Sequence, residues 1–240
     1  MKNKTIHYCW FGGAEKSKII QKCIASWKKY FPDYALQEWN ESNFDVHCNI
    51  YVEQAYEAKK YAFVSDYVRF WALEKYGGIY FDTDVEVIRS FEKLLDDEAF
   101  AGFETDEYIA PGLVLYIKNP QNEIMTKTRE WYDAARFLDE NGERIKLNVC
   151  NIFTNILKEY GFEPNGQLQT CGGMVLYPKD YFCPFNDATG VLTKTENTYA
   201  IHWYAKSWMS KGKIFRNKIT RIIHRIFGED IRQKLTKKKK

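Results

Sequence analysis

A helical stretch that ends in two glycines and leads directly into a short apolar strand constrains the fold more than any other feature. Residues 49–76 carry apolar side chains at helical spacing, and Gly77-Gly78 suits a helix end, because glycine adopts the left-handed C-cap conformation without steric cost. Residues 79–81, Ile-Tyr-Phe, then read as a fully apolar strand that runs into Asp82-Thr83-Asp84. This pattern predicts a buried strand of an open α/β sheet, with polar side chains at its carboxyl end.

The rest of the chain supports the α/β prediction. Residues 5–11 and 34–39 read as strands on either side of a helix over residues 17–31, which Pro32 ends. Beyond residue 98 the pattern predicts strands near 99–104, 112–117, 174–177 and 199–203, and helices near 121–138 and 151–160. Alternation of strands with helices favours a largely parallel sheet.

The charged residues are distributed unevenly along the 240-residue chain, although its net charge is only +3. Residues 211–240 carry twelve Lys and Arg against two acidic residues, whereas residues 1–210 carry 23 basic and 30 acidic side chains. The length fits one domain with a small appendage. We therefore predict a domain over residues 1–210 and a basic segment over residues 211–240. In that segment the apolar residues fall on one stripe of a helix, namely Phe215, Ile219, Ile222, Ile223 and Ile226.

A basic amphipathic helix of this kind predicts docking on an anionic membrane surface. Each basic residue near an anionic leaflet contributes roughly 1 kcal/mol, and the apolar stripe can enter the interface. The alternative is a helix packed on the domain and followed by a solvated run of charges. Nucleic-acid binding is disfavoured, because the body is acidic and carries no nucleic-acid motif.

The composition also bears on the compartment. The sequence shows no signal peptide and no stretch of the ~18–20 apolar residues that span a bilayer. Its six cysteines lack C-x-x-C spacing, so we expect them to be reduced and mostly buried. Together these features predict a cytoplasmic protein that is peripheral on the inner face of the cell membrane.

Asp82 and Asp84 are the first candidates for chemistry. On an extended backbone alternate residues point the same way, so we expect both carboxylates to converge on one point. Two carboxylates at close range repel unless a cation lies between them. Mg²⁺ or Mn²⁺ would serve, held by one or two carboxylates and completed by substrate phosphates and water. The alternative is a turn with two solvated aspartates.

Asp66 and Arg69 are the second candidates. They stand three residues apart on the predicted helix and therefore share one of its faces. They can form an ordinary surface ion pair, or they can point into a cleft and grip sugar hydroxyls, with bidentate geometry from the arginine. The residue pattern alone leaves both interpretations open.

Residues 65–84, SDYVRFWALEKYGGIYFDTD, resemble the characteristic segment of the DXD-containing retaining glycosyltransferases of family 32. That group includes capsular polysaccharide enzymes and relatives of the yeast initiating mannosyltransferase, and the segment also resembles the glucosyltransferase domain of the large clostridial toxins. Residues 6–13, IHYCWFGG, and residues 200–208, AIHWYAKSW, are similar to further motifs of the same group. The three motifs occur in the expected order and extend from residue 1 to about residue 210.

The resemblance implies a GT-A (Rossmann-like) fold, a nucleotide-sugar donor and Mn²⁺ or Mg²⁺. It implies that Asp82, Asp84 and His202 hold the metal at the donor diphosphate, and that Asp66 and Arg69 contact the ribose and the transferred hexose. It places four further residues around the base and the phosphates: Cys9 and Trp10 against the nucleobase, and Ser207 and Trp208 near the phosphates. Asn43, which the motifs match loosely, would lie beside the base. The alternatives are a structural histidine in an aromatic cluster at His202 and core burial at Trp10.

The implied reaction moves a hexose or N-acetylhexosamine, with retention, from a nucleotide diphosphate sugar to a glycan acceptor. We expect a UDP-sugar as donor and a lipid-linked acceptor in surface polysaccharide synthesis. Retention needs either a carboxylate nucleophile or attack on the face that the phosphate leaves, and we favour the second route. Glu104, Asp106 and Glu107 either line the acceptor side or form a solvated loop.

Two other functions fit parts of the pattern. A phosphohydrolase of the haloacid dehalogenase type also places D-x-D after an apolar strand, but it requires Thr or Val where Glu86 stands. A non-catalytic, membrane-associated carbohydrate-binding module would account for the many aromatic residues, but it would leave the paired carboxylates without a purpose.

Overall fold

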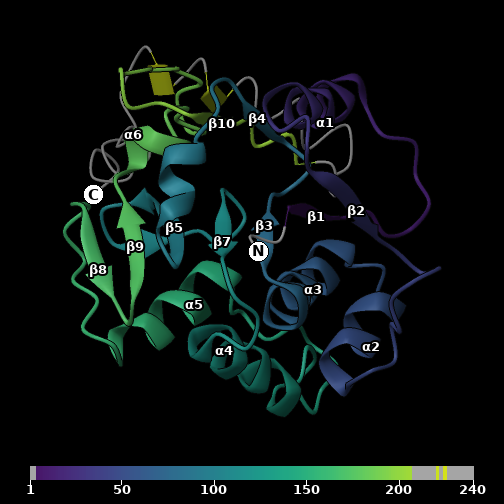
Figure 1. Cartoon of the computed structure of the whole chain (residues 1–240). Helices are drawn as coiled ribbons and strands as arrows, with labels where there is room; N and C mark the ends of the chain where they lie inside the picture. The colour runs from purple at the N-terminus through teal and green to yellow at the C-terminus, as the bar shows by residue number, and fades with distance from the viewer. Residues whose placement is uncertain (1–3, 207–219, 222–223, 226–240) are drawn as a thin grey trace, which may run out of the picture.

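The computed structural model describes residues 4–206, 220–221 and 224–225, and these build an α/β fold around one mixed sheet (Figure 1). The strand order is β2-β1-β3-β7-β5-β9-β8, and β6 pairs with β5. The strands are β1 (Thr5–Cys9), β2 (Ala35–Trp39), β3 (Gly78–Tyr80), β5 (Ala99–Thr105), β6 (Tyr108–Ile109), β7 (Leu115–Ile117), β8 (Gln169–Cys171) and β9 (Met174–Tyr177).

Most strands of this sheet run in the same direction, as predicted. β1 pairs in parallel with β2 and β3, and β5 pairs in parallel with β9. β7 is antiparallel to both β3 and β5, so β5 points the same way as β3. β7 and β8 are reversed because the connections before β7 and between β8 and β9 are too short for a crossover. Gly172-Gly173 joins β8 to β9 with positive φ at both residues, which a tight hairpin requires.

Helices cover both faces of the sheet (Figure 1). One face carries α2 (Ile50–Glu57), α3 (Tyr61–Tyr76), α4 (Glu123–Ala134) and α5 (Val149–Lys158). The other carries α1 (Lys18–Tyr30), the short α6 (Lys179–Phe182), the 3₁₀ helix η1 (Glu92–Asp96) and a two-stranded sheet of β4 (Val85–Val87) and β10 (Ala200–His202). Alternate residues of β5 enter different buried clusters, Phe100 on one face and Ala99, Ala101 and Phe103 on the other. This is the two-faced burial that a covered sheet produces.

The helix expected over residues 49–76 is two helices, because the chain turns between α2 and α3 at Lys59, whose φ is 56°. Gly77 ends α3 as predicted, and φ is positive at both glycines, 64° at Gly77 and 97° at Gly78, but a ψ of −163° places Gly77 outside the left-handed helical region. A Cβ at Gly78 would lie 2.6 Å from the Thr5 carbonyl oxygen, so only glycine lets β3 pack this closely against β1.

The buried side chain of His7 connects β1 to β2 and to the end of α3. Trp39 Nε1 donates to His7 Nδ1 at 3.2 Å, which leaves His7 Nε2 to donate to the Gly77 carbonyl at 2.9 Å. Burial lowers the pKa of His7 to about 4, and the imidazole is therefore neutral at physiological pH. One ring thus joins β1, β2 and the end of α3, where the chain enters β3.

The six cysteines, all within the described residues, form no disulfide, and four of them are buried, as predicted. Of the predicted basic segment over residues 211–240, only residues 220–221 and 224–225 fall among the described residues, and these four are helical. The apolar stripe of the predicted amphipathic helix lies outside the described residues. Within the described part of the chain, no helix combines the length and apolar character needed to cross a bilayer.

Candidate active site

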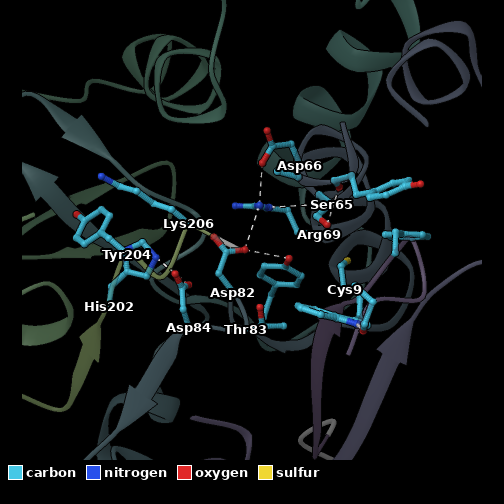
Figure 2. A pocket seen from close by; sticks show the side chains of 16 residues that line it. Cys9, Ser65, Asp66, Arg69, Asp82, Thr83, Asp84, His202, Tyr204 and Lys206 are labelled. Carbon is cyan, nitrogen blue, oxygen red and sulfur yellow. Dashed lines mark hydrogen bonds and ion pairs between the residues drawn. The ribbon is translucent and has the colours of Figure 1, made fainter. Parts of the chain in front are cut away.

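A pocket of about 370 Å³ opens at the carboxyl ends of the parallel strands β1 and β3. Its wall is built from the end of β1, from α3, from the turn between β3 and β4, and from the segment that follows β10 (Figure 2). Seven of the residues singled out in the sequence line it: Cys9, Trp10, Asp66, Arg69, Asp82, Asp84 and His202. The fold therefore brings together residues that lie up to 193 positions apart.

Arg69 lies between two carboxylates inside this pocket (Figure 2). Its Nη2 atom is 2.8 Å from Asp66 Oδ1 and 3.2 Å from Asp82 Oδ1, and its side chain is only 3% exposed. Tyr80 supports the same group, because its hydroxyl donates to Asp82 Oδ1 at 3.1 Å and its ring lies 5.0 Å from the guanidinium. Asp66 and Arg69 are thus a buried pair that faces the pocket, and not an ordinary surface ion pair.

The protonation of Asp66 follows from its burial. Desolvation raises the pKa of Asp66 to about 7, although the guanidinium of Arg69 opposes the shift and the charge of Asp82 adds to it. A carboxyl group with such a pKa can accept or donate a hydrogen bond near neutral pH.

Asp84 forms a second polar cluster with the segment after β10. His202 Nε2 lies 3.0 Å from Asp84 Oδ1, and the Ala205 backbone N–H donates to Asp84 Oδ2 at 2.7 Å. Burial alone would lower the pKa of His202, but the carboxylate of Asp84 outweighs it and raises this pKa to about 9. Burial likewise opposes ionisation of Asp84, yet the charge and hydrogen bond of His202 hold the Asp84 pKa below its usual value.

The backbone between Asp82 and Asp84 differs from the extended geometry expected. Residues 83–84 form a turn closed by the Val85 N–H, which donates to the Asp82 carbonyl at 3.1 Å, because β3 ends at Tyr80 and β4 begins at Val85. The two carboxylates both reach the pocket, but each has its own partners. Asp82 joins α3 through Arg69, and Asp84 joins the segment after β10 through His202.

Gly112 makes room for the first of these clusters. It accepts the Asp82 backbone N–H at 2.9 Å. A Cβ at this position would lie 1.9 Å from Asp82 Oδ2 and 3.0 Å from Arg69 Nη1, so any larger residue would displace the carboxylate.

The pocket contains side chains of the types that bind divalent cations. Among the described residues no three His, Cys, Asp or Glu side chains gather closely enough to hold a metal by themselves. Mg²⁺ and Mn²⁺ commonly use one or two carboxylates plus substrate phosphates and water, and an imidazole suits Mn²⁺. Asp82 is 31% exposed, and the buried Nδ1 of His202 has no hydrogen-bond partner within the described residues. Asp82, Asp84 and His202 are the pocket side chains of a suitable type, and a cation there would need phosphate and water to complete its ligands.

The remaining predicted residues have different positions. Trp10 is only partly buried and lines the pocket, with its Nε1 donating to the Ala14 carbonyl at 2.6 Å, so it is not a core residue. Asn43 is exposed and does not line the pocket, because its side chain closes the loop after β2 through the Glu38 carbonyl and the Asn40 N–H. Ser207 and Trp208 lie outside the described residues.

The three acidic residues considered for the acceptor side lie in different surroundings. Glu104, at the end of β5, accepts the Tyr204 hydroxyl at 2.8 Å, and the Tyr204 ring packs on His202 with centroids 4.1 Å apart. Asp106 and Glu107 are exposed in the turn before β6. Only Glu104 is thus connected to the pocket through hydrogen bonds and ring contacts.

Sequence reasoning missed several residues of the site. Tyr80, Tyr204 and Lys206 line the pocket, and each stands inside one of the segments singled out in the sequence. Aromatic residues in or next to a strand are typical of a hydrophobic core, so Tyr80 and Tyr204 gave no sign of a functional role. A single lysine close to a basic segment gives no specific signal either. Gly112 carries no signal in the sequence, since its importance lies in the space that it leaves.

The chain is similar to known proteins in sequence and in fold. The family model described as capsular polysaccharide synthesis protein matches residues 1–172. Among solved structures, the chain is similar to the PaToxG glycosyltransferase, with 21% identity and a TM-score of 0.50 over 66% of this chain and 69% of that one. It is also similar to a glycosyltransferase involved in the glycosylation of the major capsid of PBCV-1, with 13% identity and a TM-score of 0.48 over 90% of this chain and 99% of that one. No curated protein sequence matches the chain. The likeness to the PaToxG glycosyltransferase confirms the predicted GT-A-like fold.

Proposed function

The chain belongs to the capsular polysaccharide synthesis protein family, and on this premise we propose that it is a retaining glycosyltransferase of surface polysaccharide synthesis. It transfers a hexose or N-acetylhexosamine from a nucleotide diphosphate sugar, with a UDP-sugar favoured, to a glycan acceptor. The observation that supports this most directly is one pocket in which Asp82 and Asp84 stand with Arg69, His202 and Lys206. Carboxylates beside cations suit a ligand with both hydroxyl groups and a diphosphate.

We assign each cluster a part of the donor. Asp66 accepts a hydrogen bond from a donor hydroxyl, while Arg69 holds Asp66 and Asp82 in place through the contacts at 2.8 and 3.2 Å. Lys206, at the opposite side of the pocket, binds the diphosphate. Mn²⁺ or Mg²⁺ held by Asp82, Asp84 and His202 would neutralise the charge that develops on the departing diphosphate.

We propose that transfer takes place on one face of the sugar. The acceptor hydroxyl attacks the anomeric carbon from the side that the diphosphate leaves. Its proton passes to the leaving phosphate oxygen as the old carbon–oxygen bond breaks. No enzyme nucleophile is needed, and Glu104 stays hydrogen-bonded to Tyr204. A glycosyl–enzyme adduct on Glu104, detected by mass spectrometry after rapid quenching, would overturn this route.

Hydrolysis of nucleotide sugars tests the whole proposal. The wild-type protein should hydrolyse one UDP-sugar slowly in the presence of Mn²⁺, and a chelator should stop it. Asp84→Asn should lose this activity. Asp33→Asn is the matched control, because Asp33 is 74% exposed and pairs only loosely with Lys4 at 3.5 Å. Full activity of Asp84→Asn would refute the assignment, and release of phosphate from simple phosphomonoesters instead would point to a phosphohydrolase.

We further propose that residues 211–240 bring the enzyme to an anionic membrane, where a lipid-linked acceptor would lie. The support is the excess of basic residues in this segment. Removing residues 226–240 keeps Arg221 and Arg225, which contact the domain. This truncation removes six of the twelve Lys and Arg residues and should weaken flotation with anionic liposomes, whereas unchanged flotation would refute docking through these charges.

A further inference from the structure

One carboxylate connects the pocket lysine to the C-terminal segment. Lys206 Nζ lies 2.6 Å from Asp187 Oδ2, and the guanidinium of Arg221 pairs with the other oxygen of the same carboxylate. Arg221 Nε also donates to the Asp187 backbone carbonyl at 2.9 Å. All three side chains are largely shielded, with exposures of 22% for Lys206, 30% for Asp187 and 23% for Arg221. Asp187 is therefore shared between two cations, one of which lines the pocket.

Asp187 is carried by a tight hairpin over residues 185–192. Phe185 and Leu192 form its bridge, and the Asn186 side chain accepts two backbone N–H groups, those of Ala188 and Thr189. Gly190 closes the turn with a φ of 69°. A Cβ there would lie 3.3 Å from Arg225 Nη2 and 3.4 Å from Arg221 Cδ, so both arginines pack closely on the hairpin.

A second contact leads from Arg221 toward the pocket. Its guanidinium lies 5.2 Å from the centre of the Phe185 ring. The centre of that ring lies 5.4 Å from the centre of the Trp203 ring and 6.5 Å from that of Tyr204. Tyr204 and Lys206 have φ of 48° and 51°. Non-glycine residues seldom adopt this conformation, so it persists where the surroundings hold it. Arg221 thus supports the segment that presents Lys206 in two ways.

We propose that Arg221 is a positioning residue of the donor site. Arg221 neutralises the carboxylate of Asp187, and the positive charge of Lys206 therefore stays available to the donor diphosphate. This inference rests on the proposed function. Without Arg221, Asp187 and Lys206 form a neutral pair at the pocket wall. With Arg221 the three groups carry a net charge of +1, and a lysine ammonium that donates to Asp187 keeps two further donors. The donor site therefore extends beyond residue 210, into the segment expected to serve only as a tail.

Binding of UDP with Mn²⁺, measured by titration calorimetry, tests this role. Arg221→Ala should weaken UDP binding roughly two- to fivefold, the size expected for a partly exposed charge pair. The loss should shrink at high salt, because the interaction is electrostatic. Adding Asp187→Asn to Arg221→Ala should return the affinity to near the wild-type value, since nothing then neutralises Lys206. Arg221→Lys should retain most of the affinity.

Arg225→Ala is the matched control. Among the described residues, the Arg225 guanidinium donates to the carbonyl oxygens of Thr189 and Gly190, at 3.3 and 2.9 Å, and forms no hydrogen bond with Asp187. It should therefore bind UDP as the wild type does. Unchanged affinity in Arg221→Ala, or weaker binding in the double variant than in the single one, would overturn the inference and leave the donor site standing. A wild-type protein that binds no UDP would instead refute the proposed function, and this inference with it.

Discussion

Gly112→Ala should disable the donor site while leaving the protein folded. A Cβ at this position would lie 1.9 Å from Asp82 Oδ2 and 2.7 Å from Asp82 Cγ. Nonbonded heavy atoms settle at about 3.5 Å, so the carboxylate must move by roughly 1.5 Å. That movement breaks the contacts of Asp82 Oδ1 with Arg69 at 3.2 Å and with the Tyr80 hydroxyl at 3.1 Å.

The expected costs differ for stability and for activity. Hydrogen bonds to charged groups contribute ~1.5–3 kcal/mol, and Asp82 is 31% exposed, so we expect a loss of about 1–3 kcal/mol in unfolding free energy. At about 2–4 °C per kcal/mol the variant still unfolds cooperatively at a lower Tm. A misplacement of about 1 Å in a catalytic group can reduce turnover on the order of 100-fold.

Three assays on the same samples separate these effects. Hydrolysis of the preferred UDP-sugar measures turnover, UDP binding measures donor affinity, and thermal unfolding measures stability. The Asp82→Ala background is the control, because it removes the atoms that the new methyl group would strike. In that background Gly112→Ala should cost little further stability. Wild-type kcat/KM in Gly112→Ala would show that the carboxylate position is unimportant and would refute the reasoning.

Three further outcomes can be checked. The pKa of His202, about 9 in the folded protein against 6.5 in the unfolded chain, makes unfolding free energy fall by about 3 kcal/mol as pH rises through this range. Urea titrations at several pH values should show this fall in the wild type and not in Asp84→Asn. Mn²⁺ should raise Tm substantially only when UDP is also present, because the described side chains supply too few ligands alone; an equal shift without UDP would contradict the shared site. Trp10→Ala should weaken UDP binding measurably by calorimetry, and unchanged affinity would remove Trp10 from the base site.

The local pattern of the sequence predicts most of the elements but not how they meet. Helical spacing and the glycines at 77–78 locate α3 and β3 well, because these signals depend on near neighbours. The pairing of His202 with Asp84 depends on β10 lying antiparallel to β4, a contact over more than a hundred residues that no periodicity encodes. The burial of Arg69 is equally hidden, since an i,i+3 pair looks the same on an exposed face. The turn at residues 83–84 was missed because D-x-D after a strand reads as a continuation of that strand.

The pairing of β10 with β4 also sets the moment at which the pocket becomes complete during synthesis. His202 lies opposite Val85 in this small sheet, and Tyr204 and Lys206 follow it at once. Because translation proceeds from the N-terminus at ~5–20 residues per second, β9 is synthesised roughly 1–5 s before β10, and the other strands of the large sheet are synthesised earlier still. A nascent chain can therefore fold its sheet and still be unable to hold a sugar nucleotide. Donor binding therefore depends on the docking of β10, and it reports that this strand has paired with β4.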